Sequence, residues 1–311
     1  MNGENKVKRV GKSGSCINKV IHIVRHDIGA WGLMIPCIIA LLIFTYQPMV
    51  NGVYLSFCKT RAYDAIGWAG LQNYKDVLTD SVFLKAFTNG FKYVFWCFVI
   101  GYPLPVITAI LLNELKRGQR LFRSLLYVPG MVPGIVASIL WVVMINPGQT
   151  GLFNTILAHF GVEPLGWLQD KNLVIPTIAF TMTWGGYGGT VIMYLANLQS
   201  VNGSLYESAT LDGAGFFAKV RYITLPYLSP TLRLALVNQI IATFAIFQQV
   251  FIMTGGGPNY ASTTLGMLNY QYAFEYMQIG RASALSVIQS LILIVLTTVL
   301  YKFTDRGEVD E

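Results

Sequence analysis

Residues that could carry catalysis are few in this 311-residue sequence, and their spacing fits no catalytic motif. Gly11-Lys12-Ser13 resembles the end of a phosphate-binding loop, but that pattern requires a glycine five residues earlier, where Lys6 stands. His22 and His26 have the i, i+4 spacing of zinc proteases, but Ile23 occupies the position of the required glutamate. No Ser/His/Asp or Cys/His set can be assembled. The sequence therefore predicts a chain that is not an enzyme and holds no metal or cofactor of its own.

The polar stretch 206–230, YESATLDGAGFFAKVRYITLPYLSP, lies between two long apolar runs and is the most distinctive segment of the sequence. Ser204 and Glu207 have the spacing of a capping box, which predicts that a helix begins at Ser204 and ends at Asp212-Gly213. A second short helix is predicted over 216–223 and is expected to end at Pro226. Helices of this length are only marginally stable in water on their own. Local chemistry leaves two interpretations open: a re-entry loop that Glu207 merely caps, or a docking helix for a cytoplasmic partner.

Composition indicates the environment of the elements that flank this stretch. Hydrophobic residues make up 54% of the chain and charged residues 12%, about half the charge of a soluble domain. Runs of about 20 apolar residues, enough to cross a bilayer as helix, occur six times and contain no Asp, Glu, Lys or Arg. They predict an all-α polytopic membrane protein with six transmembrane helices, at about Trp31–Phe57, Tyr93–Leu112, Leu125–Ile145, Leu173–Leu198, Leu234–Thr254 and Ala282–Tyr301.

Basic residues predict the orientation of these spans. Of the 22 Lys and Arg residues, 15 precede the first span, follow the last, or lie between spans two and three or four and five. The positive-inside rule places these segments, and both termini, in the cytoplasm. The net charge of +7 then reflects topology, and no basic patch with interleaved aromatic residues predicts nucleic-acid binding. The expected organisation is a cytoplasmic segment 1–28, a transmembrane domain 29–303 that includes the loop 204–228, and a cytoplasmic tail 304–311.

The spacing within the polar loop resembles a known family. Glu207-Ser208-Ala209, three residues, Gly213, nine residues and then Ile223-x-Leu225-Pro226 is similar to the EAA loop of permeases in binding-protein-dependent ABC importers. The departure is Ser208, where the family has alanine. Further strings resemble the maltose-type carbohydrate branch of that family: Leu112-Asn-Glu114, Thr254-Gly-Gly-Gly-Pro258, Tyr272-Ala-Phe274 and Gly280-Arg-Ala-Ser-Ala284. The resemblance extends over about 31–303.

This resemblance implies a division of labour. Glu207 through Asp212 would form a coupling helix that fits a cleft on a cytoplasmic ATPase subunit, with Gly213 letting the turn pass close to the partner. ATP and Mg would then be bound by two such ATPase subunits and not by this chain. A second permease subunit and an extracellular solute-binding protein are also implied, the latter received by outer loops at about Cys58–Phe91, Asn146–Asn172 and Gly255–Gly280. The location implied is the bacterial cell membrane.

Neutral sugars are usually held by aromatic faces with amide and hydroxyl groups, and the fourth and fifth predicted spans supply both. By the resemblance, the residues expected to line the cargo path are Trp184, Gly186, Tyr187, Gln239 and Thr243. A structural interpretation competes with this one. Gly185 and Gly189 have the small-xxx-small spacing through which membrane helices approach closely, and glutamines often join helices.

Other function classes fit less well. A secondary transporter driven by protons or sodium usually carries acidic residues within its spans, and the six predicted spans contain none. A membrane enzyme would need a polar catalytic cluster. An ABC permease for a non-sugar solute remains open, although an anionic cargo would call for Lys or Arg in the spans.

Overall fold

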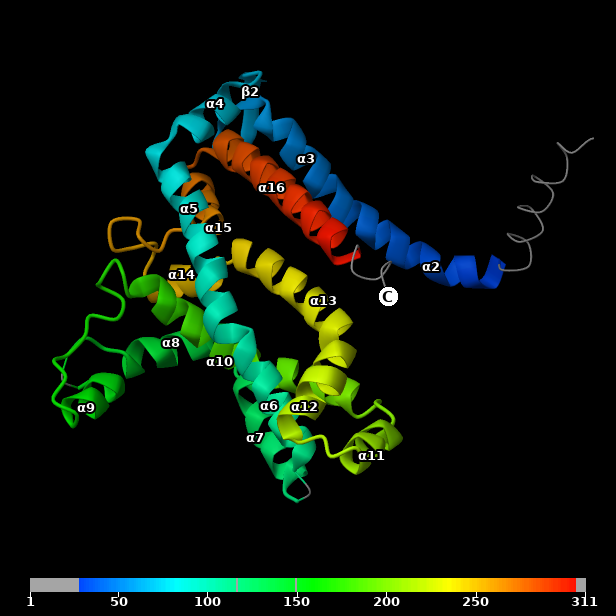
Figure 1. The fold of residues 1–311 in the computed structure, drawn as a ribbon. Helices are drawn as coiled ribbons and strands as arrows, with labels where there is room; N and C mark the ends of the chain where they lie inside the picture. The colour runs from blue at the N-terminus through cyan, green and yellow to red at the C-terminus, as the bar shows by residue number, and fades with distance from the viewer. Residues whose placement is uncertain (1–27, 116, 149, 306–311) are drawn as a thin grey trace, which may run out of the picture. The chain divides into compact units, whose positions relative to one another are not determined.

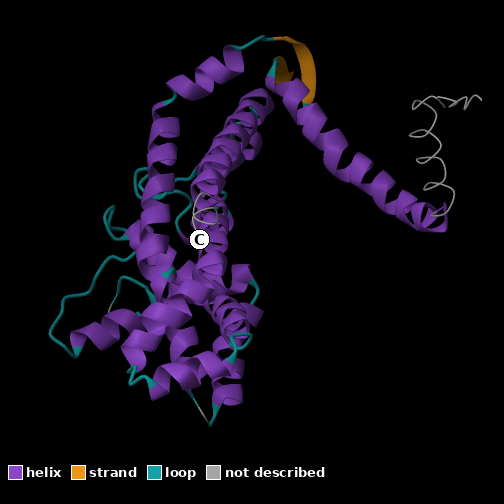
Figure 2. Ribbon diagram, turned by 45° about the vertical axis from the view of Figure 1, so that its right-hand side comes forward, coloured by secondary structure: helices purple, strands orange, loops and turns teal. Residues whose placement is uncertain are grey.

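The computed structural model describes residues 28–115, 117–148 and 150–305. Most of these residues are helical, and the strands among them form one short hairpin (Figure 2). The chain divides into two compact units, Met1–Tyr54 and Leu55–Glu311. The predicted cytoplasmic segment lies almost wholly outside the described residues, as does most of the predicted tail.

The described part of the first unit is a helix that continues across the unit boundary. It comprises α2 (Ile28–Leu41), a π-helical turn η1 (Leu42–Tyr46) and α3 (Gln47–Ser56), with Pro36 inside α2. Residues Gly32–Ser56 form one of the helices that are long and apolar enough to cross a membrane. The first predicted span is therefore present as a helix.

The second unit begins with an antiparallel hairpin, which an all-α prediction did not include. Strand β1 (Cys58–Arg61) pairs with β2 (Asp64–Trp68), and Ala62 at the turn has a positive φ of 51°. The short helix α4 (Gln72–Thr79) follows. The Asn73 side chain donates to the Ser56 and Cys58 carbonyls at 2.9 Å each, so these two backbone acceptors between α3 and β1 are hydrogen-bonded within the chain.

A long helix with one π-helical turn follows the hairpin. Asp80 caps α5 (Ser81–Trp96) by accepting from the Val82 N–H at 2.8 Å. The chain then passes through η2 (Cys97–Gly101) into α6 (Pro103–Glu114). Helix α6 starts with Pro103, and proline is tolerated there because the N–H that it lacks would have no partner in a first turn. The second predicted span is therefore longer at its N-terminal end than the sequence indicated.

The third predicted span is a bent pair of helices. α7 (Gln119–Met131) and α8 (Gly134–Met144) meet at 93° around a short break at Val132-Pro133. Pro133 cannot donate the hydrogen bond that would continue α7, so the chain changes direction there. A short helix α9 (Leu152–Ala158) and a loop lead to α10 (Val174–Leu198), which coincides with the fourth predicted span.

The chain from α11 to α14 differs most from the prediction. α11 (Gly203–Leu211) and α12 (Phe216–Lys219) are short, and a π-helical turn η3 (Val220–Thr224) runs directly into α13 (Leu225–Phe244). Helix α13 ends at Phe244, and α14 (Gln248–Met253) starts after a three-residue break. The prediction of a continuous fifth span over 234–254 was therefore wrong, because apolar composition alone does not show where backbone hydrogen bonding is interrupted.

The last described elements are α15 (Leu265–Tyr270), the π-helical turn η4 (Gln271–Glu275) and α16 (Ile279–Asp305). Figure 1 shows α7 and α11 toward one end of the second unit, with β2 and α4 toward the other. Three buried clusters hold this unit together; they centre on Tyr93, Trp141 and Ile178, on Val77, Leu268 and Leu285, and on Ala109, Val191 and Tyr194.

Three helices of the described chain are long and apolar enough to cross a membrane: Gly32–Ser56, Ser81–Glu114 and Ile279–Lys302. The bent pair α7 and α8 makes a fourth if it counts as one span. The protein is therefore a helical membrane protein, while the number of six spans stays a prediction.

Candidate functional site

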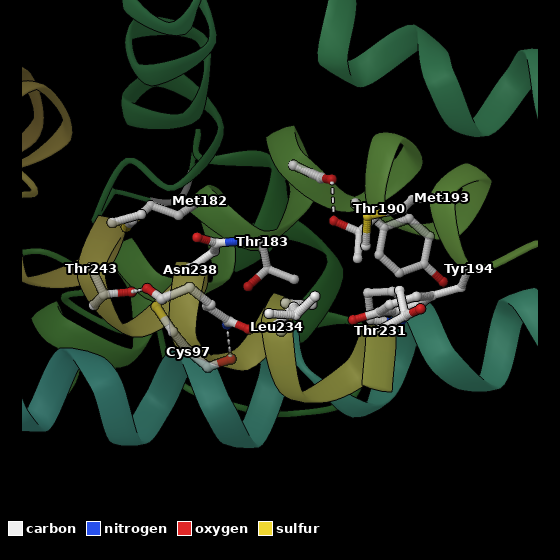
Figure 3. Close-up of a pocket in the computed structure, with 17 residues that line it drawn as sticks. Cys97, Met182, Thr183, Thr190, Met193, Tyr194, Thr231, Leu234, Asn238 and Thr243 are labelled. Carbon is white, nitrogen blue, oxygen red and sulfur yellow. Dashed lines mark hydrogen bonds between the residues drawn. The ribbon is translucent and has the colours of Figure 1, made fainter. Parts of the chain in front are cut away.

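A cavity of about 610 Å³ lies between η2 and α6, α10 and α13 (Figure 3). None of its lining side chains is charged. The lining residues are Cys97, Gly101, Pro105, Met182, Thr183, Gly186, Tyr187, Thr190, Met193, Tyr194, Thr231, Leu234, Ala235, Asn238, Gln239, Ala242 and Thr243. Hydroxyl and amide groups among apolar walls form a surface that can bind an uncharged, hydroxyl-rich molecule.

The polar groups of the cavity come from two helices that each present one face to it. On α10, Thr183, Tyr187, Thr190 and Tyr194 recur at three- and four-residue intervals, which is the spacing of a single helical face. On α13 the corresponding face carries Asn238 and its neighbours Gln239, Ala242 and Thr243. Figure 3 shows residues of both helices around the cavity, among them Thr183 and Tyr194 of α10 and Asn238 and Thr243 of α13.

Part of this polar lining is already engaged by the protein itself. The Gln239 amide donates to the Cys97 carbonyl at 2.7 Å, which joins α13 to the π-helical turn η2. The Thr243 hydroxyl, 2% exposed, donates to the Gln239 carbonyl at 2.7 Å. A Cβ on Gly101 would lie 2.9 Å from Thr183 Oγ1 and 3.0 Å from Gln239 Nε2, so glycine permits this close approach. Gln239 therefore joins helices and lines the cavity at the same time.

Four of the five residues expected to contact cargo lie on this cavity: Gly186, Tyr187, Gln239 and Thr243. The exception is Trp184, whose ring packs edge-to-face on Trp141 with centroids 5.6 Å apart. Trp184 is partly buried, packs against the buried cluster around Tyr93 and Ile178, and does not line the cavity. Consecutive residues of a helix point in different directions, so Trp184 faces Trp141 while Thr183 faces the cavity.

Asn238 is one of the polar lining residues that sequence reasoning did not nominate. Its side chain is exposed to the cavity, and no other described residue hydrogen-bonds to it. The three- and four-residue spacing of polar residues on α10 would have selected Thr183 and Thr190. Asn238 has no polar neighbour at that spacing on α13, so this signal could not have found it. An unengaged amide is free to bond a ligand, whereas the amide of Gln239 is partly used.

A smaller cavity of about 210 Å³ lies at the break between α7 and α8. It shares Met182 and Gly186 with the larger cavity and adds Ser138 and Gln249 as polar lining. The two cavities are therefore neighbours on α10, and together they offer more length than either does alone.

The predicted coupling loop forms a short helix, but its N-terminal cap is not the one expected. Asn202, not Ser204, caps α11 by accepting from the Ser204 N–H at 3.1 Å. An Asn one residue before the first turn is as good a cap as serine, so the capping-box interpretation was wrong. Gly213 has a φ of +80°, as its predicted role in ending the helix requires. Apart from its two neighbours in the chain, no described residue lies within 4 Å of a Cβ built there.

Side-chain hydrogen bonds join α11 to the segment that leads into α13. The Tyr206 and Thr224 hydroxyls lie 3.0 Å apart, and Thr224 is 4% exposed. The Lys219 ammonium donates to the Thr210 hydroxyl at 2.8 Å. Pro226 does not end a helix as predicted, because it lies in the first turn of α13, where a missing N–H costs nothing.

The remaining residues of the EAA-like pattern are largely accessible. Glu207, Ser208, Leu225 and Pro226 are exposed, and Ala209 and Ile223 are half-buried. Asp212 is the C-terminal cap of α11. Two further apolar side chains, Leu211 and Phe217, are 89% and 84% exposed. An exposed short helix flanked by uncovered apolar side chains is a surface suited to a protein partner.

Polar contacts also join α4 and α5 to the segment around the start of α16. Arg281 donates from Nε and Nη2 to one carboxylate oxygen of Asp76, at 3.2 and 2.7 Å. This hydrogen-bonded guanidinium lowers the pKa of Asp76. The Tyr272 hydroxyl donates to Asp80 at 2.5 Å, and burial together with this carboxylate raises the pKa of Tyr272.

An apolar helical unit with an uncharged polar-lined cavity and a short exposed helix is the architecture of a membrane transport subunit. The sequence model for the family described as "Binding-protein-dependent transport system inner membrane component" matches residues 101–308. The chain belongs to this family. Within the described residues, no cluster of three His, Cys, Asp or Glu side chains could hold a metal ion.

Relatives agree with this assignment over nearly the whole chain. The chain is 30% identical to the multiple sugar-binding transport system permease protein MsmF of Streptococcus mutans, over 93% of this chain and 99% of that one. It is 28% identical to the arabinooligosaccharides transport system permease protein AraP of Bacillus subtilis, over 88% of each. A crystal structure of a bacterial ABC transporter that imports the acidic polysaccharide alginate matches the fold with a TM-score of 0.83 at 22% identity, over 93% of this chain and 99% of that chain.

Proposed function

We propose that this chain is the permease subunit of an ATP-driven importer and passes a neutral sugar or short oligosaccharide across the bacterial cell membrane. The observation that carries the proposal is the uncharged cavity between α6, α10 and α13, whose walls offer hydroxyl, amide and aromatic groups but no ammonium, guanidinium or carboxylate. Charged cargo would have to shed water without gaining a counter-charge there, which is costly. The relatives named for sugar transport support a sugar as the cargo, while its neutrality rests on the cavity alone.

The free energy for transport would come from ATP bound by other subunits. Within the family resemblance, the exposed helix α11 is the part that an ATPase subunit would hold, with Glu207 facing a basic group across the contact. ATP and Mg would be bound by two such ATPase subunits. The hydrogen bonds from Tyr206 to Thr224 and from Lys219 to Thr210 would then carry movement of α11 into α13, a wall of the cavity. A ligand or partner moves such a two-state equilibrium only as far as it binds the two states differently.

The remaining partners follow the same resemblance. A second permease subunit would complete the membrane-spanning unit, and an extracellular solute-binding protein would deliver the sugar. Both termini and α11 would lie in the cytoplasm, as the distribution of Lys and Arg indicates. A carrier for an acidic solute is the main alternative cargo class, and the uncharged cavity argues against it.

Uptake of labelled oligosaccharides tests the cargo class and the cavity together. A host strain that lacks this gene would receive either wild type or Asn238→Leu, and uptake of neutral and of acidic oligosaccharides would be measured. Because Asn238 has a free amide in the cavity, we expect its loss to raise the half-saturating concentration for a neutral sugar by about fivefold or more, the value of one hydrogen bond. The amount of protein in the membrane should not change.

A matched variant separates binding from folding. Gln239→Leu removes the bond to the Cys97 carbonyl, so we expect it to lower both uptake and thermal stability, unlike Asn238→Leu. Wild-type uptake of acidic but not neutral sugars would contradict the proposed cargo class. Unchanged affinity and selectivity in Asn238→Leu would remove Asn238 from the binding surface.

A further inference from the structure

A separate pocket, of about 280 Å³, brings three lysines together away from the central cavity. Lys85 and Lys92 come from α5, and Lys171 comes from the turn that precedes α10. The remaining walls are Thr88, Asn89, Pro258, Asn259, Tyr260 and Ala261. No carboxylate is among these lining residues, so the pocket is a concentrated positive site.

The position of these lysines is set by an internal framework. The Asn89 side chain, 3% exposed, donates to the carbonyls of Tyr260 and Thr263 at 3.0 Å each, and Tyr93 donates to the Ser262 carbonyl at 3.1 Å. These bonds hold the 258–263 loop against α5. Asn259 and Tyr260 both have positive φ, 47° and 62°, so this loop has one specific shape. The two walls formed by α5 and by this loop are therefore held together by hydrogen bonds.

The ammonium groups in this pocket have little neutralising charge nearby. Lys85 lies 5.4 Å from the centroid of the Tyr260 ring, and Lys92 donates to Asn89 at 3.4 Å, the long end of the hydrogen-bond range. Among the described residues, none of the three lysines forms an ion pair. The adjacent Asp170 does not line the pocket, and its carboxylate accepts from the Asn172 N–H at 2.6 Å. All three lysines are exposed, and their mutual repulsion would be relieved by an anion.

We propose that this lysine pocket receives a carboxylate side chain from the extracellular solute-binding protein and so guides its docking. The proposal rests on the proposed function, which places the pocket on the outer side. Its walls come from three segments that the sequence analysis assigns to that side, around 85–92, at 171 and at 258–261. Charge complementarity of this kind chiefly raises the association rate and fixes the orientation of two proteins.

The central cavity argues for a protein carboxylate over an acidic sugar. A negatively charged cargo held by the lysines would have to move on into walls that carry no charge, and it would lose its counter-ions at that step. The pocket is also slightly smaller than the 300–1,000 Å³ or so of typical small-molecule sites. A single acidic side chain that projects from a protein surface fits both observations.

Uptake kinetics of a charge-neutral variant test the proposal. The triple variant Lys85→Gln, Lys92→Gln and Lys171→Gln would replace wild type in the deletion strain, and uptake of a labelled neutral oligosaccharide would be measured at rising KCl. At such an exposed contact, loss of each lysine is expected to raise the half-saturating concentration about two- to threefold. The half-saturating concentration should therefore rise about tenfold, with the maximal rate within twofold of wild type. The salt dependence seen with wild type should become nearly flat.

Two further variants serve as matched controls. Lys59→Gln with Lys75→Gln removes two exposed lysines assigned to the same side that do not line the pocket, and it should leave the kinetics unchanged. Lys85→Arg, Lys92→Arg and Lys171→Arg keeps the charge and should preserve most of the affinity. Immunoblots of membranes would confirm equal amounts of each variant.

Several outcomes would overturn the proposal. Unchanged half-saturation in the glutamine triple variant, or a fall in maximal rate alone, would show that the lysines do not guide docking. A defect confined to a labelled oligogalacturonate, with neutral uptake unaffected, would assign the pocket to acidic cargo instead. Absence of any wild-type uptake above the deletion strain would instead refute the proposed function itself, which keeps the two failures distinguishable.

Discussion

Replacing Gly188 by alanine tests the crossing of α10 over α7. A Cβ built at Gly188 would lie 1.9 Å from the Leu126 carbonyl oxygen and 2.9 Å from the Tyr127 Cα, both backbone atoms. Ordinary contacts begin near 3.4 Å, so the two helices would have to separate by about 1.5 Å. A backbone cannot rotate away as a side chain can, and the strain must spread into the packed cluster around Val191 and Tyr194.

Gly189 provides the matched control. It is exposed, and a Cβ there would meet nothing within 4 Å. Gly189→Ala should therefore be neutral or stabilise the helix by up to about 1 kcal/mol through helix propensity. Gly188→Ala gains the same propensity but adds an overpacking cost of about 1–3 kcal/mol. The two variants, one residue apart with the same chemical change, should differ in free energy of unfolding by about that cost.

Unfolding in mixed detergent micelles gives the comparison directly. SDS would be titrated into each purified protein while tryptophan fluorescence is followed, because Trp141 and Trp184 pack on each other close to the crossing. The midpoint of Gly188→Ala should fall clearly below that of Gly189→Ala at equal slope. Equal midpoints, or a lower midpoint for Gly189→Ala, would show that the close approach lies elsewhere and would refute this reasoning.

Three further predictions concern the α11 loop and the ion pair between Asp76 and Arg281. Glu207→Lys should leave the protein in the membrane but abolish uptake and partner-stimulated ATP hydrolysis; normal transport would remove the coupling role. Tyr206→Phe deletes the hydroxyl bonded to Thr224, so we expect about 1 kcal/mol less stability and more ATP hydrolysed per sugar imported, measured in proteoliposomes. Asp76→Asn should lower the thermal midpoint at pH 7 by an amount equivalent to at most about 1 kcal/mol. Because Arg281 lowers the pKa of Asp76, this difference is complete above the unfolded-state value of about 3.9 and should close as pH falls through the lower folded-state pKa.

Sequence reasoning located most of the candidate site because its signals are local. The apolar runs coincide with α10 and with long stretches of helix in α5 to α6 and in α16. The loop pattern identified the short helix α11 and the left-handed glycine at Gly213. Four of five nominated residues lie on one cavity. The length of an apolar run, its hydropathy and the residues that form a turn depend only on neighbours in the chain. They can therefore be recognised in the sequence without knowledge of the tertiary structure.

Most of the features that sequence reasoning missed depend on contacts between segments far apart in the chain. The sequence offered close packing through Gly185 and Gly189 as the alternative to a cargo-lining role, and the structure places a close backbone approach at Gly188, where α7 crosses. It nominated Trp184, whose ring packs on Trp141, and did not nominate Asn238, which lines the cavity. It also missed the hairpin after Ser56, the break after Phe244 and the gathering of Lys85, Lys92 and Lys171.

The amino-acid sequence by itself determined that this is an apolar helical membrane protein and that its polar loop carries the family's pattern. Only the tertiary structure decided which face of each helix closes a cavity, which glycine meets a carbonyl and which lysines share a pocket. The physical reason is that helix periodicity defines faces but not their partners. Partners are chosen by packing between segments far apart in the chain, such as α10 against both α7 and α6.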